Sequence, residues 1–376
     1  MKKVLILTAA YGEGHNAAAR GLQAGFEQIG GVEAKVVDSF AESLGSAYDR
    51  SRKGYLKLID RAPHVWAAVF SLLHYTPVIH LVVPTLSPVR KALARVLEAE
   101  SPDAVVSTYP VYNYLLDRLP PRGFPQYTVV TDSITINSVW HRSRSDLFFV
   151  PNEDTARVMR DAKVPAEKLR VLGFPVPPRF AAPRAERSKP GRGQPLRVLF
   201  MINAAKDRAP ALVQRLLEIS GIELTVTAGR DEALQAAIRA VGEKAGRPVE
   251  VYGWTPQMPE LLMSHHLLIG KAGGAAVQET IAARTPMIAT QVVPGQEEGN
   301  ARLLTENRCG AVCETSEAVA AMIEKLRAED AREWREWETN ITRLSRPDAA
   351  VKIAEAVLQE LAASPARPKS DVHEMH

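Results

Sequence analysis

Short apolar runs rich in β-branched residues alternate with amphipathic helical patterns along most of the chain. Such runs are typical of strands buried on both faces, and the patterns between them are typical of helices that cover a parallel sheet. In the first half this alternation predicts helices such as His15–Ile29 and Val89–Glu98. The strands predicted around them are Val4–Thr8, Ala34–Asp38, Ala104–Ser107, Tyr127–Thr131, Leu147–Val150 and Leu169–Leu172.

The alternation stops at residues 174–195, a run rich in Pro, Gly and Arg, and then starts again. A run without apolar periodicity is typical of a linker between domains. The strands predicted after it are Arg197–Ile202, Glu223–Thr227, Val249–Tyr252, Leu267–Ile269, Met287–Ala289 and Ala311–Cys313. We therefore expect an α/β protein with two Rossmann-like domains facing a cleft, in which ligands bind outside the carboxyl ends of the strands.

The change of pattern sets the expected domain boundaries. The first domain spans residues 1–175, the linker 176–195 and the second domain 196–348. Residues 349–362 are expected to form a final helix, and the polar residues 363–376 a disordered tail. A chain of 376 residues is long enough for about two domains, each with its own core.

Charge and cysteine content narrow the class of protein. The net charge of +4 is too diffuse to indicate nucleic-acid binding, although it favours anionic substrates or an acidic membrane face. The 2 cysteines, Cys309 and Cys313, exclude a disulfide framework, argue against a zinc site and fit a reducing cytoplasm. The apolar run near the amino terminus leads into a glycine-bearing loop, so we interpret it as a strand rather than a signal peptide. No stretch approaches the roughly 20 apolar residues of a membrane span.

The strongest chemical signal lies in the second half, where a strand leads through glycines into a helix. The run Leu267–Ile269 is followed by Lys271-Ala-Gly273-Gly274, and a helical pattern begins near Ala275. Such a unit directs backbone N–H groups and the positive end of the helix dipole at a ligand, and a pyrophosphate fits that position. Glycines are needed because a side chain would hold the phosphates away from the backbone.

Two further polar features follow this unit. Glu279 lies one turn into the expected helix, where its carboxylate can accept hydrogen bonds from ribose hydroxyls. The loop at residues 294–300 follows an apolar strand and is dense in groups that can bind sugar hydroxyls. Taken alone, the glycines could be a plain helix start and Glu279 a solvated helix residue, but the combination is much less common.

Together these blocks closely resemble the donor-binding half of the family 28 glycosyltransferases. Among them they look most like the monogalactosyldiacylglycerol synthase and processive diacylglycerol glucosyltransferase group, whose pattern is G-W/F-x-x-x-M, then K-x-G-G/P-x-x-x-x-E, then P-G-Q-E-x-x-N. The matching residues are Gly253, Trp254, Met258, Lys271, Gly273, Gly274, Glu279, Pro294, Gly295, Gln296, Glu297 and Asn300. The resemblance implies the GT-B architecture of two facing Rossmann-like domains.

By this resemblance, the second domain binds a UDP-sugar. The expected contacts are the uracil with the backbone of Thr255–Met258, the diphosphate with Gly273 and Gly274, the ribose with Glu279, and the transferred sugar with Gln296 and Glu297. Lys271 could supply positive charge to the leaving diphosphate. The choice among galactose, glucose and N-acetylglucosamine is not written in these residues.

The first half resembles the same group less completely. Gly12-Glu13-Gly14-His15 stands where the group has G-G-G-H. The resemblance assigns Gly12 and Gly14 to the donor site. Glu13 replaces the second glycine, so the backbone of the loop can adopt fewer conformations there. His15, at a helix start, is expected to act as general base on an acceptor hydroxyl or to orient the acceptor. A helix N-terminus would lower its pKa and favour the neutral form. The alternative is a capping or structural histidine.

A second candidate base is Asp132. The segment Thr131–Trp140 resembles the group's T-D-x-x-x-H-x-x-W block and keeps Asp132 and Trp140. The histidine is absent, with Ile136 or Asn137 near its place, and the spacing to Trp140 is one residue longer. This departure affects the identity of the acceptor more than that of the donor. The alternative for Asp132 is a helix or turn cap.

The stretch Tyr48–Arg95 has the composition of a peripheral membrane contact. Basic residues alternate there with interfacial aromatic residues, which suits a helix lying on anionic lipid. The alternative is an ordinary amphipathic helix pair packed on the domain. With the resemblance, the expectation is a cytoplasmic protein on the inner face of the cell membrane with a lipid acceptor, and the pattern carries no signal for oligomeric state.

The expected reaction is an inverting displacement at the anomeric carbon, with His15 or Asp132 deprotonating a diacylglycerol-type acceptor. The sequence has no D-x-D motif for a metal, and no cofactor is expected beyond the donor itself. Three alternatives stay open: a lipid-linked N-acetylglucosaminyltransferase of cell-wall synthesis, a UDP-sugar 2-epimerase, and a non-catalytic nucleotide-sugar-binding module.

Overall fold

The computed structural model describes residues 1–121, 123–183, 187–191 and 193–363. It divides into two compact units. The first unit contains Met1–Pro178, the short segment Pro294–Gln296 and the described chain from Pro347 onward. The second unit contains Arg179–Val293 and Glu297–Arg346. Apart from Ala363, the expected tail lies outside the described residues.

The first unit is built on a six-stranded parallel sheet with the strand order β2-β1-β3-β4-β5-β6. Its strands are β1 (Lys2–Leu7), β2 (Val32–Val37), β3 (Ala104–Ser107), β4 (Gln126–Val129), β5 (Leu147–Val150) and β6 (Leu169–Val171). All six strands predicted for this half are confirmed, with ends shifted by no more than two residues. Every residue of β3 and of β5 is buried, because helices cover both faces of the sheet.

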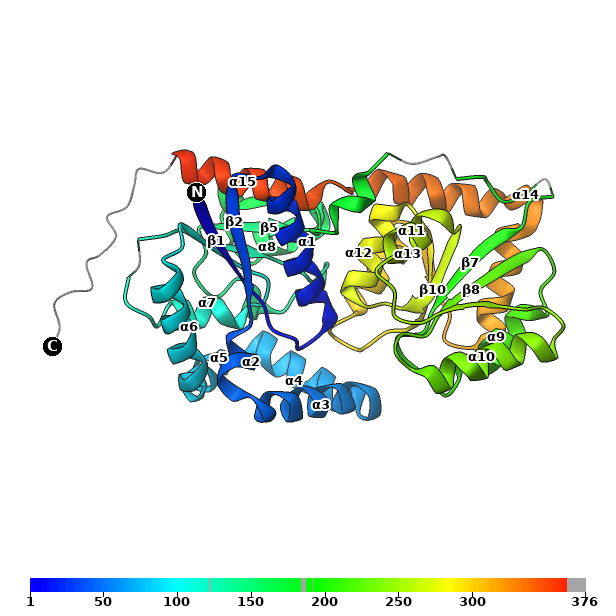
Figure 1. Ribbon diagram of the computed structural model, residues 1–376, viewed down its shortest axis with the longest axis horizontal. Helices are drawn as coiled ribbons and strands as arrows, with labels where there is room; N and C mark the ends of the chain where they lie inside the picture. The colour runs from blue at the N-terminus through cyan, green and yellow to red at the C-terminus, as the bar shows by residue number, and fades with distance from the viewer. Residues whose placement is uncertain (122, 184–186, 192, 364–376) are drawn as a thin grey trace. The chain divides into compact units, whose positions relative to one another are not determined.

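The helices of this unit include one from the far end of the chain. They are α1 (Glu13–Ile29), α2 (Ser39–Leu44), α3 (Ser46–Arg61), α4 (Pro63–Tyr75), α5 (Ile79–Val82), α6 (Ser87–Glu100), α7 (Val111–Leu116), α8 (Glu153–Asp161) and α15 (Ala349–Ala363), with 3₁₀ turns η1 (Val83–Leu86), η2 (Ser138–Trp140) and η3 (Ala166–Lys168). The expected final helix is therefore present. It lies alongside α1 (Figure 1), so closely that a Cβ atom on Gly25 would come 2.5 Å from the carbonyl oxygen of Ala350.

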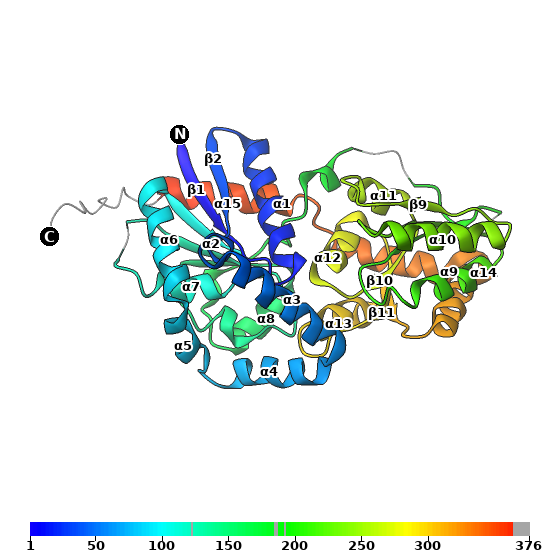
Figure 2. The same cartoon turned by 60° about the horizontal axis from the view of Figure 1, so that its bottom comes forward.

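The helices α3 and α4 pack against each other and lead into the short α5 (Figure 2). Large apolar side chains are exposed along this segment, namely Leu56, Val65, Val69, Leu72, Tyr75, Leu81 and Val82. Among the described residues, no single helix is long and apolar enough to cross a membrane. The pair α4 and Ile79–Glu100 has the length and composition together, but it is bent by 95°.

The second unit has its own six-stranded parallel sheet, in the order β12-β11-β10-β7-β8-β9. Its strands are β7 (Leu196–Met201), β8 (Ile222–Thr227), β9 (Glu250–Tyr252), β10 (Leu267–Lys271), β11 (Met287–Gln291) and β12 (Gly310–Val312). Its helices are α9 (Ala209–Leu217), α10 (Glu232–Lys244), α11 (Met258–Ser264), α12 (Gly274–Ala283), α13 (Glu298–Glu306) and α14 (Ser316–Leu344), the last interrupted at Ala328–Ala331. The six strands predicted for this half are also confirmed.

The described part of the expected linker is anchored rather than free. It contains the 3₁₀ turn η4 (Pro178–Ala181), and the buried side chain of Arg187 donates to the carbonyl oxygens of His265, at 2.5 Å, and Arg284, at 2.8 Å. Arg187 also pairs with Glu338 at 3.2 Å. These contacts hold the segment against the second unit, which the composition of the run did not indicate.

Candidate active site

In the first unit, His15 lies where three neighbouring strands end. It belongs to the first turn of α1, shortly after β1. Thr108 follows β3 directly, and Thr131 comes shortly after β4. Because β1, β3 and β4 are neighbours in a parallel sheet, their carboxyl ends share one edge and bring these three residues together.

The hydrogen bonds of His15 fix its tautomer. Its Nδ1 atom lies 2.8 Å from the carbonyl oxygen of Thr108 and 3.0 Å from Oγ1 of Thr131. A carbonyl oxygen can only accept, so Nδ1 carries the proton and Nε2 keeps its lone pair. Burial lowers the pKa of His15 to about 4, and the Thr108 hydrogen bond opposes this only in part. The imidazole is therefore neutral at physiological pH, with a basic nitrogen that has no hydrogen bond to the described residues.

Asp132 lies beside the same cluster. Its Oδ2 atom accepts a 2.7 Å hydrogen bond from Nε1 of Trp140, and the Trp140 ring lies 5.9 Å from the ring of His15. Burial raises the pKa of Asp132 to about 6, while the Trp140 hydrogen bond works in the opposite direction. One buried indole thus contacts both candidate bases.

In the glycine loop before His15, Gly12 has a backbone conformation that residues with a side chain rarely adopt. Gly12 is the N-cap of α1 with a φ of +122°. Glu13, which replaces a glycine of the group's pattern, is the first residue of the helix and pairs with Arg20. An acidic residue is favourable at a helix N-terminus, so this substitution is accommodated. Gly14 lies in the same first turn.

In the second unit, the strand, the glycines and the helix expected to bind phosphate follow one another as β10, Gly273 and α12. β10 ends at Lys271, Gly273 is the N-cap of α12, and no side chain caps the helix. The first N–H groups of a helix have no partner within it, so this end is suited to an anion. The N–H of Lys271 donates to Oδ1 of Asn203, in the loop after β7, at 3.2 Å.

The motif after β11 is tied to this unit by an ion pair. Nζ of Lys271 lies 2.8 Å from Oε1 of Glu297, and the other oxygen, Oε2, accepts a 2.9 Å hydrogen bond from the N–H of Val293. Nδ2 of Asn300 donates to the carbonyl oxygen of Ala272 at 3.1 Å. Glu297 and Asn300, assigned to the donor by resemblance, therefore also hold the glycine loop in place.

The other expected donor residues lie on α12 or in segments that follow strands of the second sheet along the chain. Glu279 is partly buried on α12, and Gln296 lies in the loop between β11 and α13. Thr255 and Met258 follow β9, where Oγ1 of Thr255 accepts from the N–H of Gln257 at 3.1 Å and Met258 begins α11. All these positions follow strands whose carboxyl ends face the same way.

Some site residues were missed by the sequence. Thr108 and Tyr109 surround His15, with the Tyr109 ring 5.0 Å from the imidazole, and Asn203 supports Lys271. A polar residue directly after a predicted strand is a signal that could have identified Thr108 and Asn203. The ring contact depends on the packing of separate segments.

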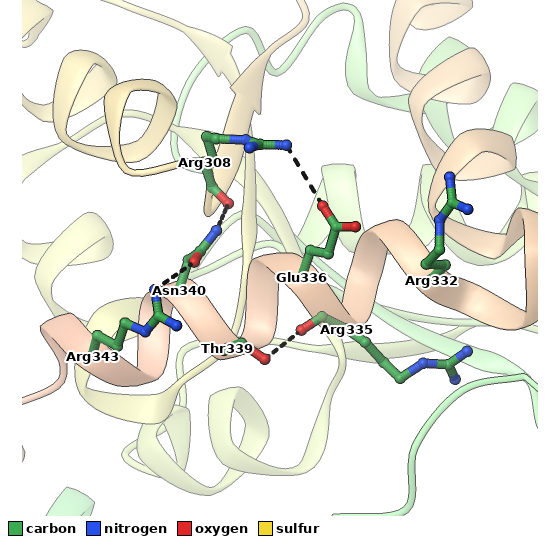
Figure 3. A pocket seen from close by; sticks show the side chains of 7 residues that line it. All are labelled: Arg308, Arg332, Arg335, Glu336, Thr339, Asn340 and Arg343. Carbon is green, nitrogen blue, oxygen red and sulfur yellow. Dashed lines mark hydrogen bonds and ion pairs between the residues drawn. The ribbon is translucent and has the colours of Figure 1, made fainter.

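A hollow of about 380 Å³ lies elsewhere in the second unit, on the exposed face of α14. It is lined by Arg308, Arg332, Arg335, Glu336, Thr339, Asn340 and Arg343. Arg308 pairs with Glu336, and the side chains of Arg332 and Arg335 point away from each other (Figure 3). The arginines therefore do not converge on one ligand position.

Two family models match the chain. Residues 15–176 match monogalactosyldiacylglycerol synthase, and residues 199–353 match the glycosyltransferase family 28 C-terminal domain. The processive diacylglycerol β-glucosyltransferase of Bacillus thuringiensis (strain Al Hakam) is 28% identical over 365 residues, which are 95% of this chain and 94% of that protein. The protein of the same name from Bacillus mycoides (strain KBAB4) is 27% identical over 370 residues, 96% of this chain and 95% of that protein.

Solved structures support the fold. MurG from Acinetobacter baumannii has a TM-score of 0.63 at 15% identity, covering 96% of this chain and 100% of that one. A UDP-GlcNAc 2-epimerase from Neisseria meningitidis has a TM-score of 0.56 at 13% identity, also covering 96% and 100%. The fold alone thus does not separate transferases from epimerases, whereas the family models do. The chain therefore joins a monogalactosyldiacylglycerol synthase domain to a glycosyltransferase family 28 C-terminal domain in a GT-B fold.

Proposed function

We propose that the protein is an inverting hexosyltransferase that moves galactose or glucose from a UDP-sugar to a diacylglycerol-type lipid. The observation that carries the proposal is the His15 cluster: a neutral imidazole with a free Nε2, in the half of the chain that matches monogalactosyldiacylglycerol synthase. The similarity to diacylglycerol glucosyltransferases over nearly the whole chain supports the lipid acceptor.

On the donor side, the uncapped start of α12 is proposed to bind the diphosphate. Gly274 begins α12 without a side-chain cap among the described residues, and Lys271 adds a positive charge beside this end of the helix. These groups would stabilise the negative charge that develops on the leaving UDP. Glu279 is proposed to hold the ribose, and Gln296 with Glu297 the transferred sugar.

On the acceptor side, His15 is proposed as the general base in preference to Asp132. Nε2 of His15 is available, whereas one oxygen of Asp132 is engaged by Trp140. The acceptor hydroxyl would give its proton to Nε2 as it attacks the anomeric carbon, and the bond to the UDP oxygen would break on the opposite side, which inverts the configuration. Thr108 and Thr131 keep the tautomer that this step requires.

The protein is further proposed to contact an anionic membrane through α3, α4 and α5. Exposed basic residues on α3, Arg50, Lys53 and Lys57, lie close in sequence to the exposed apolar residues of α4 and α5. Apolar side chains that enter the lipid and basic ones that face its head groups are the combination that holds a peripheral protein. A cytoplasmic enzyme with a lipid acceptor would need such a surface.

A screen of donors and acceptors tests the reaction. The protein is incubated with UDP-glucose, UDP-galactose or UDP-N-acetylglucosamine and vesicles that contain diacylglycerol, and UDP and glycolipid are measured. Glycolipid from glucose or galactose is expected. Transfer of N-acetylglucosamine only to a lipid-linked cell-wall precursor, an epimerised sugar without lipid product, or binding without turnover would each replace the proposal with one of its alternatives.

Two substitutions test the site assignment. Glu279→Ala is expected to weaken UDP binding about tenfold or more, because it removes charged hydrogen bonds to the ribose. His15→Ala is expected to leave UDP binding intact and to lower kcat about 100-fold or more. Glu306→Ala, which removes an exposed carboxylate from α13, serves as the control and should change neither value. Normal turnover in both site variants would reject the assignment.

A further inference from the structure

The loop that joins β1 to α1 is held by α3, a helix that starts more than 30 residues later. The N–H of Ala10 donates to the hydroxyl of Tyr48 at 2.5 Å, and that hydroxyl donates to Oδ2 of Asp38 at 2.8 Å. The hydroxyl of Tyr11 lies 2.7 Å from Oγ of Ser51. Two successive residues of the loop are thus bonded to two residues one turn apart on α3.

This loop sets the position of His15. It ends at Gly12, whose φ of +122° starts α1, and His15 lies in the first turn of that helix. The ring of Tyr11 is stacked at 6.0 Å on Tyr109, which meets the imidazole edge-on at 5.0 Å. A shift of Ala10 or Tyr11 would therefore reach His15 both through the backbone and through the Tyr109 ring.

Tyr48 is suited to this task because its hydroxyl is permanently protonated. The side chain is 5% exposed, and burial raises its pKa, as does the hydrogen bond to Asp38. The hydroxyl therefore accepts from Ala10 while it donates to Asp38 over the whole physiological range. Oδ1 of the same carboxylate caps α2 by accepting from the N–H groups of Phe40 and Ala41. The side chain of Asp38, to which Tyr48 donates, is therefore itself held in place.

We infer that Tyr48 and Ser51 are positioning residues, through which α3 clamps the β1–α1 loop and keeps Nε2 of His15 in place for proton transfer. The inference rests on the proposed function, since it takes His15 as the base. It assigns a catalytic consequence to two contacts of α3 that do not involve His15 itself.

His15 is buried, so a shift of the loop would also change the surroundings of its imidazole. The groups that face His15 are the carbonyl of Thr108, the hydroxyl of Thr131, the ring of Tyr109 and the indole of Trp140, which carries Asp132 behind it. On its own helix, Glu13 is paired with Arg20. Since burial is the main cause of the low pKa of His15, a looser loop should let that pKa rise towards its ordinary value.

The test compares Tyr48→Phe with Tyr112→Phe. Tyr112 is a matched control: it is also buried, and its hydroxyl also accepts a backbone N–H, that of Ser39 at 2.8 Å, but it is not bonded to the loop. Both variants should lose thermal stability. Only Tyr48→Phe should lower kcat, about tenfold, with the donor KM unchanged, because a misplaced base slows the chemical step.

Two pH measurements separate positioning from plain destabilisation. In Tyr48→Phe, the acid limb of kcat and the NMR titration of the His15 imidazole should both move up by about one pH unit. Ser51→Ala should move them in the same direction by less, and Tyr112→Phe should leave them unchanged. Equal behaviour of Tyr48→Phe and Tyr112→Phe in kcat and in the His15 titration would overturn the inference.

The failure of the clamp and the failure of the proposed function are distinguishable. If His15→Ala turns over normally, the proposed base is wrong, whereas the NMR titration of His15 in Tyr48→Phe still measures the clamp without any turnover. If His15→Ala is inactive and Tyr48→Phe matches the control, the base stands and the clamp is rejected.

Discussion

At the scale of single residues, Lys271 has two partners for its positive charge, the carboxylate of Glu297 and the proposed diphosphate. It is proposed to face the diphosphate, and in the structure its ammonium pairs with Glu297, whose side chain is 7% exposed against 25% for the lysine. A buried carboxylate and a diphosphate compete for the same positive charge. The pair satisfies the buried carboxylate, and it would limit the strength with which Lys271 binds a phosphate group.

This competition predicts opposite effects of two substitutions on UDP binding. Glu297→Gln should tighten it a few-fold, because the amide oxygen can still accept from Val293 while Lys271 is released. Lys271→Met should weaken UDP binding about tenfold, because a charge-assisted contact to the diphosphate is lost. Calorimetric titration with UDP, which lacks the sugar that Glu297 is proposed to hold, measures both. Arg302→Met, in an exposed ion pair on α13, is the control, and a change of the same sign in both variants would contradict this reading.

At the scale of elements, α3 contacts the loop before His15, whereas α4 and α5 expose apolar side chains. These exposed side chains belong to none of the buried apolar clusters described for the unit. Leu72 is 51% exposed and Leu81 is 75% exposed. Exposed apolar residues gathered in one segment indicate a binding surface, whereas single ones do not.

The double substitution Leu72→Ser and Leu81→Ser should weaken vesicle binding about 100-fold, because each leucine transferred into lipid contributes roughly 1.5–3 kcal/mol. Flotation with vesicles of anionic and of neutral lipid measures the effect, and salt should weaken only the binding to anionic lipid. Val312→Ser, at an exposed apolar residue of the second unit, is the control. Unchanged flotation of the double variant would exclude this surface.

At the scale of the whole molecule, each unit contains a histidine that is buried in its neutral form. In the second unit, Nδ1 of His266 accepts from the N–H of Arg197 at 2.9 Å, and Nε2 donates to the carbonyl oxygen of Ser188 at 2.6 Å. Burial lowers the pKa of His266 to about 3, against about 4 for His15 in the first unit. The hydrogen bond that Nδ1 of His266 accepts requires the neutral ring, whereas Nε2 can donate in either form.

These two histidines predict that the protein loses stability in mild acid. Unfolded histidine titrates near 6.5, so below that pH the unfolded chain takes up protons that the folded chain refuses. The contribution of each histidine to the free energy of unfolding should be at its maximum above about pH 6.5. Below that pH it should fall by about 1.4 kcal/mol per pH unit for each histidine. Urea unfolding between pH 7.5 and 5 measures this. His266→Asn, which keeps an acceptor for Arg197, should reduce the slope, and an unchanged slope would rule out its contribution.

The positions of the strands, the two α/β halves and the phosphate-binding unit could all be predicted from the sequence. The periodicities of strands and helices are local, because the position of a residue along a strand or helix decides which face its side chain lies on. Residues just after parallel strands lie at one edge, so the position of Lys271 and Gly273 between β10 and α12 could be predicted without knowledge of the contacts, whereas their role in donor binding stays a prediction. The anchoring of Arg187 was not foreseen, since a Pro- and Gly-rich composition says nothing about which surface a single long side chain will reach.

What the sequence determined by itself is therefore the architecture of each half and the edge of each sheet that carries chemistry. What only the tertiary structure decided is which distant residues meet there: Thr108 and Thr131 on His15, Glu297 on Lys271, Tyr48 on Ala10, and α15 on α1. The physical reason is that these partners lie on segments separated in the chain, and their meeting depends on how whole elements pack. No local pattern of residues encodes that packing.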